Sequence, residues 1–346
     1  MKKVIVGISG GVDSSVASVL LQKQGYEVVG LTFVFTDEFD PTDAINVCKK
    51  LNIEHHIIDY RHEFKEKIID TFINDYNNGV TPNPCVLCNK EVKFNFLFQK
   101  MLEYNCDYLA TGHYAKIINN KLYKSEDLNK DQTYFLAQIP KAQLSKLILP
   151  LEGMTKNDVR KVANEHGLIN ANKKDSTDVC FITGNFKEYI SNNSTNLEGS
   201  IVNINTNQVI GKHSGLTKYT IGQRKGLNVG GLTDRLFVVG KNLKENILYV
   251  ALGDDNEYLY SDSCIINNVN FNCDERPTKC TAKFRYRSHE YPVELDYISD
   301  TEIMVKYDKV KSVTPGQVCV LYLSDQCLGG GTIKEVRSNN KKIWYL

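Results

Sequence analysis

The sequence has no long apolar run and no secretion-type leader. It has 346 residues, 42% of them hydrophobic, but no stretch of about 18 consecutive apolar residues. We therefore expect no membrane-spanning segment. The amino terminus has two lysines followed by a short apolar run, Val4 to Ile8, and then a glycine-rich turn. This pattern is typical of a first core strand and not of a signal peptide, so we expect a cytoplasmic protein.

The sequence also lacks an excess of either charge. Its 42 Lys and Arg residues nearly balance 41 Asp and Glu residues, so the formal net charge is +1. Such a chain has no global positive field and can bind a nucleic acid only through a local basic patch. Taken alone, this composition favours an enzyme with a small-molecule substrate.

Cysteine is plentiful, with ten residues, but a second CxxC motif is missing. A self-contained four-cysteine zinc site is therefore not expected. In a reducing cytosol, cysteines are more often buried, catalytic or metal-binding than joined in structural disulfides.

The first half of the chain alternates short β-branched runs with amphipathic segments. Strands separated by helices predict parallel βαβ units and an α/β doubly wound parallel sheet. The expected strands are 3–8, 27–35, 56–59 and 108–111, and the expected helices are 14–24, 43–51, 63–76, 89–103 and 147–166.

The pattern changes near position 195, where helical periodicity fades. Short apolar runs separated by turn residues then predict one or two small all-β barrel domains. We expect a catalytic domain at 1–195, a small central β domain at 196–255 and a carboxyl-terminal β-barrel at 256–346. The expected strands are 199–204, 209–210, 236–239, 247–251, 280–286, 293–297, 302–307, 318–322 and 331–336.

The strongest motif is SGGVDSS, Ser9 to Ser15, between the first predicted strand and the first predicted helix. Gly10 and Gly11 allow the backbone to approach a polyphosphate, and the amides and dipole of the helix amino terminus bind negative charge. The motif lacks the Gly-Lys-Ser/Thr of a Walker A loop and the spacing of a dinucleotide fingerprint. A glycine-rich turn without a ligand is the alternative, but the context favours a phosphate-binding loop.

The second motif is TPNPCVLCNKEVKFNFLF, Thr81 to Phe98. Its prolines predict a rigid, extended approach to a helix that begins near Asn89. Cys85 and Cys88 would then precede the helix amino terminus, which favours a thiolate and suits a nucleophile. Half of a structural zinc site is the alternative.

Three other segments contain candidate residues. Cys180 lies in KKDSTDVCFI, and taken alone it is more typical of a buried core cysteine. TGHYAK, Thr111 to Lys116, follows a strand, where ligands bind in open α/β sheets. LNKDQTYFL, Leu128 to Leu136, mixes charged and aromatic residues. A solvated loop with core residues is the alternative for the last two.

Together these segments closely resemble bacterial tRNA-specific 2-thiouridylases of the MnmA type, within the PP-loop ATP pyrophosphatase superfamily. The resemblance covers nearly the whole chain. It rests on SGGVDSS, TPNP with CNKEVKF, ATGHY, NKDQTYFL, KKDST with CFI, GLTKYTIGQRKGL, FRYR, TPGQ and CLGGG.

The resemblance implies a mechanism and its catalytic residues. Such enzymes use ATP, with Mg²⁺, to adenylate the C2 oxygen of the wobble uridine, release pyrophosphate and replace the oxygen by sulfur. Cys180 would hold the sulfur as a persulfide, Cys88 would be the nucleophile and Asp13 would assist. The two cysteines are also candidates for a catalytic disulfide. The implied ATP contacts are Gly7, Ile8, Ser9, Gly10, Gly11, Val12, Asp13, Ser14, Phe33 and Gly112.

The same resemblance implies two partners: the anticodon arm of tRNA, and a cysteine desulfurase or sulfur-relay protein. A local basic patch would include Lys218, Arg224, Lys225, Arg285, Arg287 and Lys306, although these charges could simply form a solvated face. The implied tRNA contacts are Asn83, Pro84, Cys85, His113, Lys130, Asp131, Gln132, Arg285, Tyr286 and Gln317.

The sequence departs from the family pattern at three places. Cys85 stands where the family usually has Asp, the stretch after Gly30 is short, which affects the contact expected at Phe33, and Asp178 replaces a common glycine. Because Cys85, Cys88 and Cys180 could ligate an iron–sulfur cluster, cluster-dependent thiolation is an alternative to the persulfide route. A non-thiolating RNA-binding paralog and a PP-loop amidating synthetase are further alternatives, and the cysteines argue against both.

Overall fold

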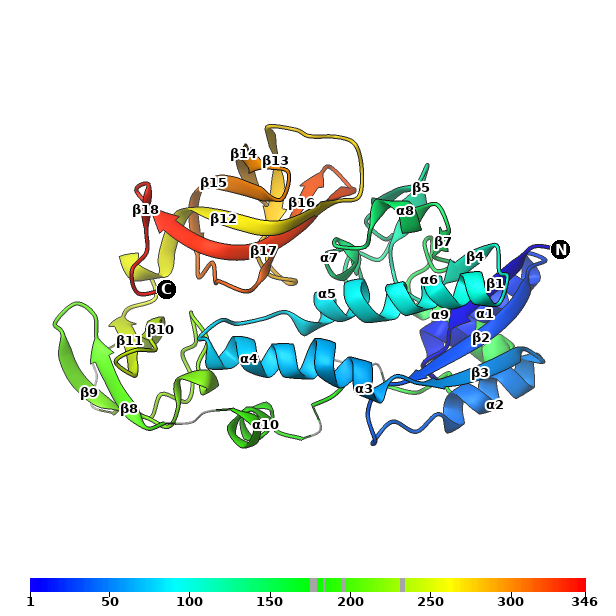
Figure 1. Ribbon diagram of the computed structural model, residues 1–346, viewed down its shortest axis with the longest axis horizontal. Helices are drawn as coiled ribbons and strands as arrows, with labels where there is room; N and C mark the ends of the chain where they lie inside the picture. The colour runs from blue at the N-terminus through cyan, green and yellow to red at the C-terminus, as the bar shows by residue number, and fades with distance from the viewer. Residues whose placement is uncertain (175–178, 183, 195–196, 231–233) are drawn as a thin grey trace.

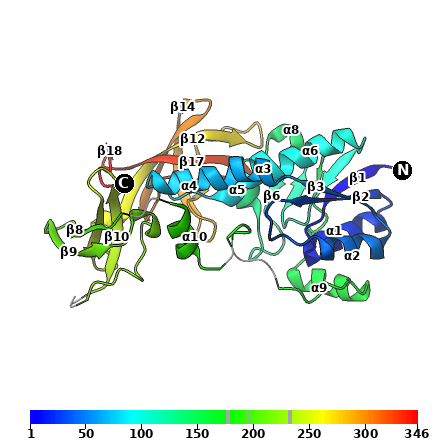
Figure 2. The ribbon, with the colours of Figure 1, turned by 60° about the horizontal axis from the view of Figure 1, so that its bottom comes forward.

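The computed structural model describes residues 1–174, 179–182, 184–194, 197–230 and 234–346. The amino terminus lies in an α/β region at one end of an elongated molecule, and the carboxyl terminus lies among β-strands at the other end (Figure 1, Figure 2). Helices α3 to α6 run along the middle and connect the two regions (Figure 1).

The α/β region is built on a parallel sheet in the order β3-β2-β1-β4-β7, and all its pairings are parallel. Its central strand is a continuous apolar run because both faces of the sheet are covered. Val4 and Val6 pack against α1 and α2, and Ile5 packs against α6, so the predicted doubly wound arrangement is confirmed. The strands are β1 (Lys3–Gly7), β2 (Glu27–Val34), β3 (Glu54–Asp59), β4 (Tyr108–Ala110) and β7 (Leu147–Ile148).

The first three predicted helices, 14–24, 43–51 and 63–76, are found within two residues of their predicted ends. Two helical segments are continuous through π turns, η1 (Lys65–Asp70) and η2 (Asn89–Lys93), so residues 61–77 and 84–103 each form one long rod. The helices are α1 (Val12–Lys23), α2 (Thr42–Leu51), α3 (Arg61–Phe64), α4 (Thr71–Asn77), α5 (Pro84–Cys88), α6 (Phe94–Glu103), α7 (Thr133–Leu136), α8 (Lys141–Leu144), α9 (Lys156–Glu165) and α10 (Phe186–Asn193).

The helix expected over 147–166 is wrong in its first half. Residues 147–148 form the edge strand β7, and Pro150 and Gly153 lie in the turn that follows. Proline lacks an amide hydrogen and glycine is a poor helix former, so neither supports a helix interior. The helix begins only after Thr155, whose side chain accepts from the amide of Asp158 in a capping box.

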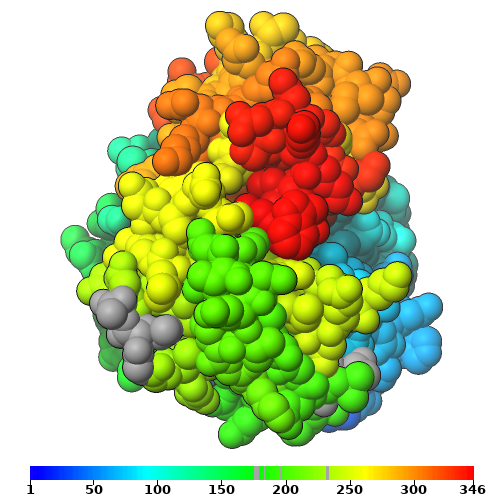
Figure 3. Space-filling model, turned by 90° about the vertical axis from the view of Figure 1, so that its left-hand side faces the viewer, coloured from blue at the N-terminus to red at the C-terminus, as the bar shows by residue number. Residues whose placement is uncertain are grey.

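The β region contains a four-stranded sheet and a closed barrel, as the sequence predicted. The sheet has the order β10-β11-β8-β9, and the barrel closes because β12 pairs with both β15 and β17. Figure 3 shows the face on which the green residues around β8 and β9 lie beside yellow residues and close to the red carboxyl-terminal segment. The strands are β8 (Gly199–Asn203), β9 (Gln208–His213), β10 (Leu236–Asn242), β11 (Ile247–Leu252), β12 (Tyr260–Phe271), β13 (Lys279–Lys283), β14 (Tyr291–Ser299), β15 (Glu302–Lys311), β16 (Val318–Leu323), β17 (Gln326–Ser338) and β18 (Lys341–Lys342).

Two predictions for this region need correction or stay open. The strand expected over 280–286 ends at Lys283, because residues 284–288 form a turn. The domain boundaries at 195 and 255 stay a prediction.

A small hairpin joins the two regions. Strands β5 (Lys116–Ile118) and β6 (Lys121–Tyr123) leave the α/β region, and β6 pairs with β17 of the barrel through Leu122 and Cys327. One apolar core then runs without a break from Ile5 on the parallel sheet to Val320 on the barrel.

Arg285 ties the barrel to the segment that precedes β10. Its Nη2 donates to the carbonyl of Ile221 at 3.0 Å, to the carbonyl of Ser312 at 2.9 Å and to Oγ1 of Thr314 at 2.7 Å. One cation thus satisfies acceptors from two parts of the β region, and burial lowers the pKa of the guanidinium.

We predict that Arg285→Ala destabilises this junction. The lost hydrogen bonds leave partly buried acceptors unpaired, which costs about 1–3 kcal/mol. We expect a lower urea midpoint by circular dichroism for this variant. The matched control is Arg287→Ala two residues away, because Arg287 is exposed and we expect its midpoint to stay near the wild-type value. Equal midpoints for the two variants would contradict the assigned role.

Candidate functional site

The predicted phosphate-binding loop lies between β1 and α1. Gly10 has a φ of +76°, and a Cβ there would lie 2.9 Å from Cβ of Asp43, so both the conformation and the space require glycine. Gly11 caps α1 without a side chain, and Oγ of Ser14 donates to the carbonyl of Gly11 at 3.1 Å. The loop is held by its own serine, and the amino terminus of α1 opens directly behind it.

The loop lies where the strand order of the sheet reverses. β1 has β2 on one side and β4 on the other, and ligands bind at the carboxyl ends of strands at such a switch point. Gly112, just after β4, faces the loop so closely that a Cβ would lie 2.7 Å from the backbone of Asp13 and Ser14. Gly112 thus lies at the carboxyl edge of the parallel sheet, where the sequence predicted it, and it packs directly against the phosphate-binding loop. Its contact with ATP stays a prediction.

Asp13 is held by residues that the sequence analysis did not select. Lys156 Nζ donates to Oδ1 and Oδ2 of Asp13 at 2.7 and 2.8 Å, and the Tyr114 hydroxyl donates to Oδ1 at 2.8 Å. Nδ2 of Asn170 donates to the carbonyl of Gly10 at 2.9 Å. Tyr114 lies within the TGHYAK motif, but no local pattern distinguished Lys156 or Asn170.

Phe33, near the end of β2, packs into an aromatic cluster. Its ring centroid lies 5.2 Å from that of Tyr60, 5.6 Å from that of Phe35 and 6.3 Å from that of Phe96. A half-buried ring with these contacts is at the correct sheet edge for an adenosine, and the contact itself stays a prediction.

The helix that contains Cys85 and Cys88 begins earlier than the sequence suggested. It starts at Pro84, not near Asn89, because proline is well suited to the first helical position and Asn83 caps the helix by accepting from the amide of Val86 at 3.3 Å. Both cysteines therefore lie inside the first helical turns, three residues apart on one face.

Cys180 reaches the same place from a distant part of the chain. The following residue, Phe181, is buried against Phe64 and Phe72, with ring centroids 5.7 and 5.3 Å away. Cys88 belongs to this same apolar cluster, so the packing of Phe181 brings the two cysteines together. Much of the KKDST motif and Asp178 lie outside the described residues.

A small cavity separates the cysteine side chains. Cys85, Cys88, Cys180 and Lys93 line it together with apolar side chains, and its volume of about 20 Å³ is room for a single water-sized group. Cys88 is buried, with only 4% of its surface exposed, whereas Cys180 is exposed to solvent. Cys180 is therefore not a buried core cysteine. The prediction from the isolated segment is therefore wrong, while the structure agrees with a cysteine that faces a site.

Lys93 places a positive charge among these thiols. Burial raises the pKa of Cys88 to about 12 and also raises that of Cys85, while the Lys93 ammonium acts in the opposite direction on both. Burial acts to lower the pKa of the Lys93 ammonium, but its electrostatic interactions with Cys88, Cys180 and Cys85 act to raise it. The net pKa lies above the ordinary value for lysine. The net pKa shift of Cys85 and Cys88 therefore disfavours the thiolate of both cysteines, contrary to the preference predicted from the helix terminus, and Lys93 offsets only part of the effect of burial. No local pattern distinguished Lys93 from Lys90 and Lys100 on the same helical rod.

His113 connects the cysteine cavity to the phosphate loop. Burial, followed by the charge of Lys93, lowers the pKa of His113 to about 3, so the ring is neutral. Its ring lies 5.6 Å from that of Phe94, and its Nδ1 is 2.8 Å from Oγ1 of Thr111. The neighbouring residue Gly112 lies against the phosphate-binding loop. Residues 111–113 therefore lie between that loop and the cysteine cavity.

Several predicted tRNA contacts gather around Tyr286. Its ring packs against that of Phe135 in a tilted arrangement with centroids 4.3 Å apart, and burial, followed by the charge of Asp131, raises the pKa of its hydroxyl, while Lys130 acts in the opposite direction. Asp131 itself is buried and accepts from Oγ1 of Thr133 at 2.6 Å. The structure thus brings the 128–136 segment to the 284–288 turn.

Other predicted tRNA contacts make hydrogen bonds within the protein. Nε2 of Gln317 donates to the carbonyl of Thr81 at 2.8 Å and holds the approach to Asn83 and Pro84. Oε1 of Gln132 accepts from the amide of Tyr114 at 2.9 Å. Gln317, Gln132 and Arg285 therefore hold neighbouring backbone segments in place through these hydrogen bonds. Their contact with tRNA stays a prediction.

Comparison with known proteins covers the entire chain. Three family models match it: a tRNA methyl transferase HUP domain over residues 2–184, a tRNA methyl transferase PRC-barrel domain over 187–252 and an aminomethyltransferase β-barrel domain over 261–333. A tRNA-specific 2-thiouridylase MnmA from Geobacillus thermodenitrificans is 44% identical over 99% of this chain and 98% of that protein. The chain belongs to the MnmA family.

A second curated relative gives the same result for the family. The tRNA-specific 2-thiouridylase MnmA of Mycoplasmopsis synoviae is 42% identical over 100% of this chain and 99% of that protein. Among solved structures, a 4-thiouridine synthetase in complex with RNA and ATP is similar over 52% of this chain and 44% of that chain, with 19% identity and a TM-score of 0.36.

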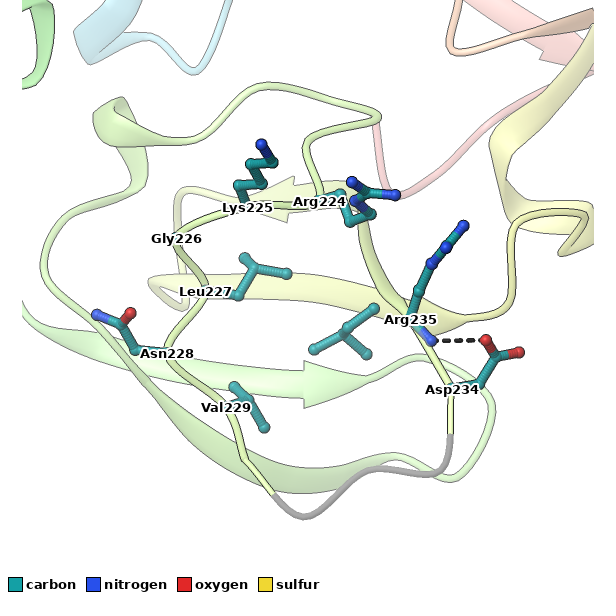
Figure 4. Close-up of a pocket in the computed structure, with 9 residues that line it drawn as sticks. Arg224, Lys225, Gly226, Leu227, Asn228, Val229, Asp234 and Arg235 are labelled. Atoms are coloured by element: carbon teal, nitrogen blue, oxygen red, sulfur yellow. Dashed lines mark hydrogen bonds between the residues drawn. The ribbon is translucent and has the colours of Figure 1, made fainter.

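The β region of this MnmA family member has a larger pocket of about 370 Å³, lined in part by Arg224, Lys225 and Arg235. The side chains of these three residues point to the same side of the loop (Figure 4). Arg235 pairs with Asp254 at 3.0 Å. Of the remaining predicted basic patch, Lys306 pairs with Asp296 at 2.5 Å, and the role of the patch in binding tRNA stays a prediction.

Two negative findings concern the described part of the chain. No group of three or more His, Cys, Asp or Glu side chains there is arranged to hold a metal ion. No helix within it is long and apolar enough to cross a bilayer.

We predict that Lys93→Met raises the pKa of Cys88 further, because the variant loses the one described cation that favours its thiolate. The rate of Cys88 alkylation by a small reagent, followed by mass spectrometry from pH 7 to 10, should fall at each pH. The thiolate fraction drops about tenfold for each unit of pKa. Lys90→Met is the control on the same helix, since Lys90 pairs with Glu91 and does not line the cavity. Equal alkylation profiles for the two variants would exclude an electrostatic role for Lys93.

Proposed function

We propose that this protein is a tRNA-uridine 2-sulfurtransferase that adenylates C2 of the wobble uridine with ATP and then replaces the oxygen by sulfur from a cysteine persulfide. The observation that carries the proposal is the meeting of Cys88 and Cys180, 92 positions apart (180 − 88), at one cavity. That cavity is joined to the phosphate loop through Lys93, His113 and Gly112.

The phosphate loop supports the adenylation step. The free amides at the amino terminus of α1 and the helix dipole favour bound phosphates, which arrive as the Mg²⁺ complex of ATP. The uridine C2 oxygen attacks the α-phosphorus, pyrophosphate leaves, and the oxygen becomes part of an AMP leaving group. Asp13 and Lys156 lie beside this loop as a preformed ion pair that holds its geometry.

The two cysteines support the sulfur step. A persulfide on Cys180 carries the outer sulfur, and the Cys88 thiolate attacks the inner sulfur of Cys180. A Cys88–Cys180 disulfide forms and the outer sulfur leaves as hydrosulfide, which attacks C2 and displaces AMP. The small cavity admits one such group, and the exposure of Cys180 suits loading by an external donor such as a cysteine desulfurase or a relay protein.

The convergence of loops around Tyr286 supports a tRNA partner. An aromatic ring beside Lys130 and Asp131 is suited to base stacking and to contacts with edges and phosphates of an unstacked anticodon nucleotide. The pocket at Arg224 and Lys225 offers further phosphate contacts on the β region. Such a reaction belongs in the cytoplasm, where tRNA is modified.

The test measures transfer of labelled sulfur. Anaerobic protein is incubated with ATP, unmodified tRNA, a cysteine desulfurase and ³⁵S-cysteine, and label in tRNA is counted. We expect incorporation to require ATP and to fall by at least a hundredfold in Cys88→Ser and Cys180→Ser, while the protein stays colourless and free of iron. Cys280→Ser is the control, because Cys280 lies in the barrel on β13. Absence of label with wild-type protein would leave an RNA-binding paralog, and activity that requires iron would favour the cluster route.

We also predict that Gly112→Ala weakens ATP binding. The added Cβ would lie 2.7 Å from the loop backbone at Asp13 and Ser14, so the loop must move. Isothermal calorimetry should show at least a tenfold weaker ATP affinity, with the circular dichroism spectrum retained. Gly153→Ala is the control, since a Cβ there meets nothing within 4 Å. Unchanged affinity in Gly112→Ala would place ATP elsewhere.

A further inference from the structure

The three cysteines at the cavity differ in accessibility in a graded way. Cys180 is exposed, Cys85 is partly buried and Cys88 is buried. Each thiol interacts electrostatically with the others and with Lys93, so all three lie within one local field. The proposed function uses only Cys88 and Cys180, and it leaves Cys85 without a chemical role.

The proposed sulfur step leaves the enzyme oxidised after every turnover. Once hydrosulfide departs, Cys88 and Cys180 are joined by a disulfide, and Cys180 cannot accept another sulfur until that bond is broken. The Cys180 sulfur of this bond is exposed and Cys88 is only 4% exposed, so an external reductant can attack the bond from the Cys180 side alone. A third thiol that reaches Cys88 from within the site would open the bond from the other side and release Cys180 directly as a free thiol.

We propose that Cys85 is the resolving thiol that frees Cys180 for the next turnover. The proposal rests on the persulfide route described above. The Cys85 thiolate attacks the sulfur of Cys88, a Cys85–Cys88 bond forms, the Cys88–Cys180 bond breaks, and the electron pair leaves on the Cys180 sulfur, which takes up a proton. An external dithiol then reduces the Cys85–Cys88 bond by two electrons and is itself oxidised to a disulfide.

The helix geometry allows the second disulfide. Residues three apart in an α-helix have Cα atoms about 5 Å apart, within the range that a disulfide spans. Pro84 and the Asn83 cap fix the first turn, so Cys85 is held on the same helix face as Cys88. The partial exposure of Cys85 leaves the new bond accessible to a reductant from outside.

The position of Lys93 suits the exchange. Burial raises the pKa of the attacking Cys85 thiol, and the Lys93 ammonium offsets part of this effect and so favours its attack on Cys88. The other cysteines lack this arrangement. Cys48 and Cys106 are buried in the α/β region outside the cavity, and the rest lie in the β region.

The test maps the disulfide that remains when reductant is limiting. The protein is incubated with ATP, tRNA, a cysteine desulfurase with cysteine, and a limiting protein dithiol such as thioredoxin. Samples are quenched in acid, alkylated, digested without reduction and analysed by mass spectrometry. We expect a Cys85–Cys88 bridge in wild-type protein. In Cys85→Ser we expect a Cys88–Cys180 bridge, with thiolated tRNA stalling near one equivalent per enzyme.

The controls separate this proposal from the function it rests on. Cys280→Ser should turn over many times and form the wild-type bridge. If Cys85→Ser also turns over many times and wild-type protein shows only a Cys88–Cys180 bridge, the resolving role is wrong and the persulfide route remains. If Cys85→Ser makes no thiolated tRNA at all, Cys85 acts in the chemistry or in base contact and not in resolution. If Cys88→Ser or Cys180→Ser turns over normally, the sulfur route itself fails.

Discussion

A single apolar core shared by the α/β region and the barrel is the constraint on which the rest of the molecule depends. Buried side chains of β1 and α6 continue into those of β16 and β17, and the β5–β6 hairpin pairs directly with the barrel. The hydroxyl of the fully buried Tyr134 donates to the carbonyl of Val318 at 2.8 Å within this core. The barrel is therefore a structural part of the catalytic region and not a separately attached module.

This shared core explains the placement of the functional loops. Gln317 lies directly before β16, and its side chain donates to the carbonyl of Thr81. The barrel therefore holds the segment that leads to Cys85 and Cys88. Tyr286 extends from the barrel onto Phe135 of the α/β region. The same packing therefore positions both sets of side chains.

Much of the fold could be predicted from local patterns, and the exceptions have physical causes. The apolar runs identified β1 and β2 because central parallel strands are apolar on both faces, and shorter apolar stretches indicated the strands β3 and β4. Strand β12 was missed because it is rich in Ser, Asp and Asn, and it becomes a strand through pairing with two neighbours in a closed barrel. The β5–β6 hairpin was missed because its burial comes from a partner far along the chain. The SGGVDSS loop could be placed locally, whereas the meeting of Cys88 and Cys180 followed only from the family resemblance.

The pairing of β6 with β17 also affects how the chain is made. Tyr123 and Gln326 are partners although 203 residues separate them (326 − 123). At a synthesis rate of about 5–20 residues per second, the ribosome needs roughly 10–40 seconds between the two strands. During that interval Leu122 and its neighbours have no barrel to cover them. The nascent α/β region must therefore remain partly open, and exposed to chaperones, until nearly the last codon has been translated.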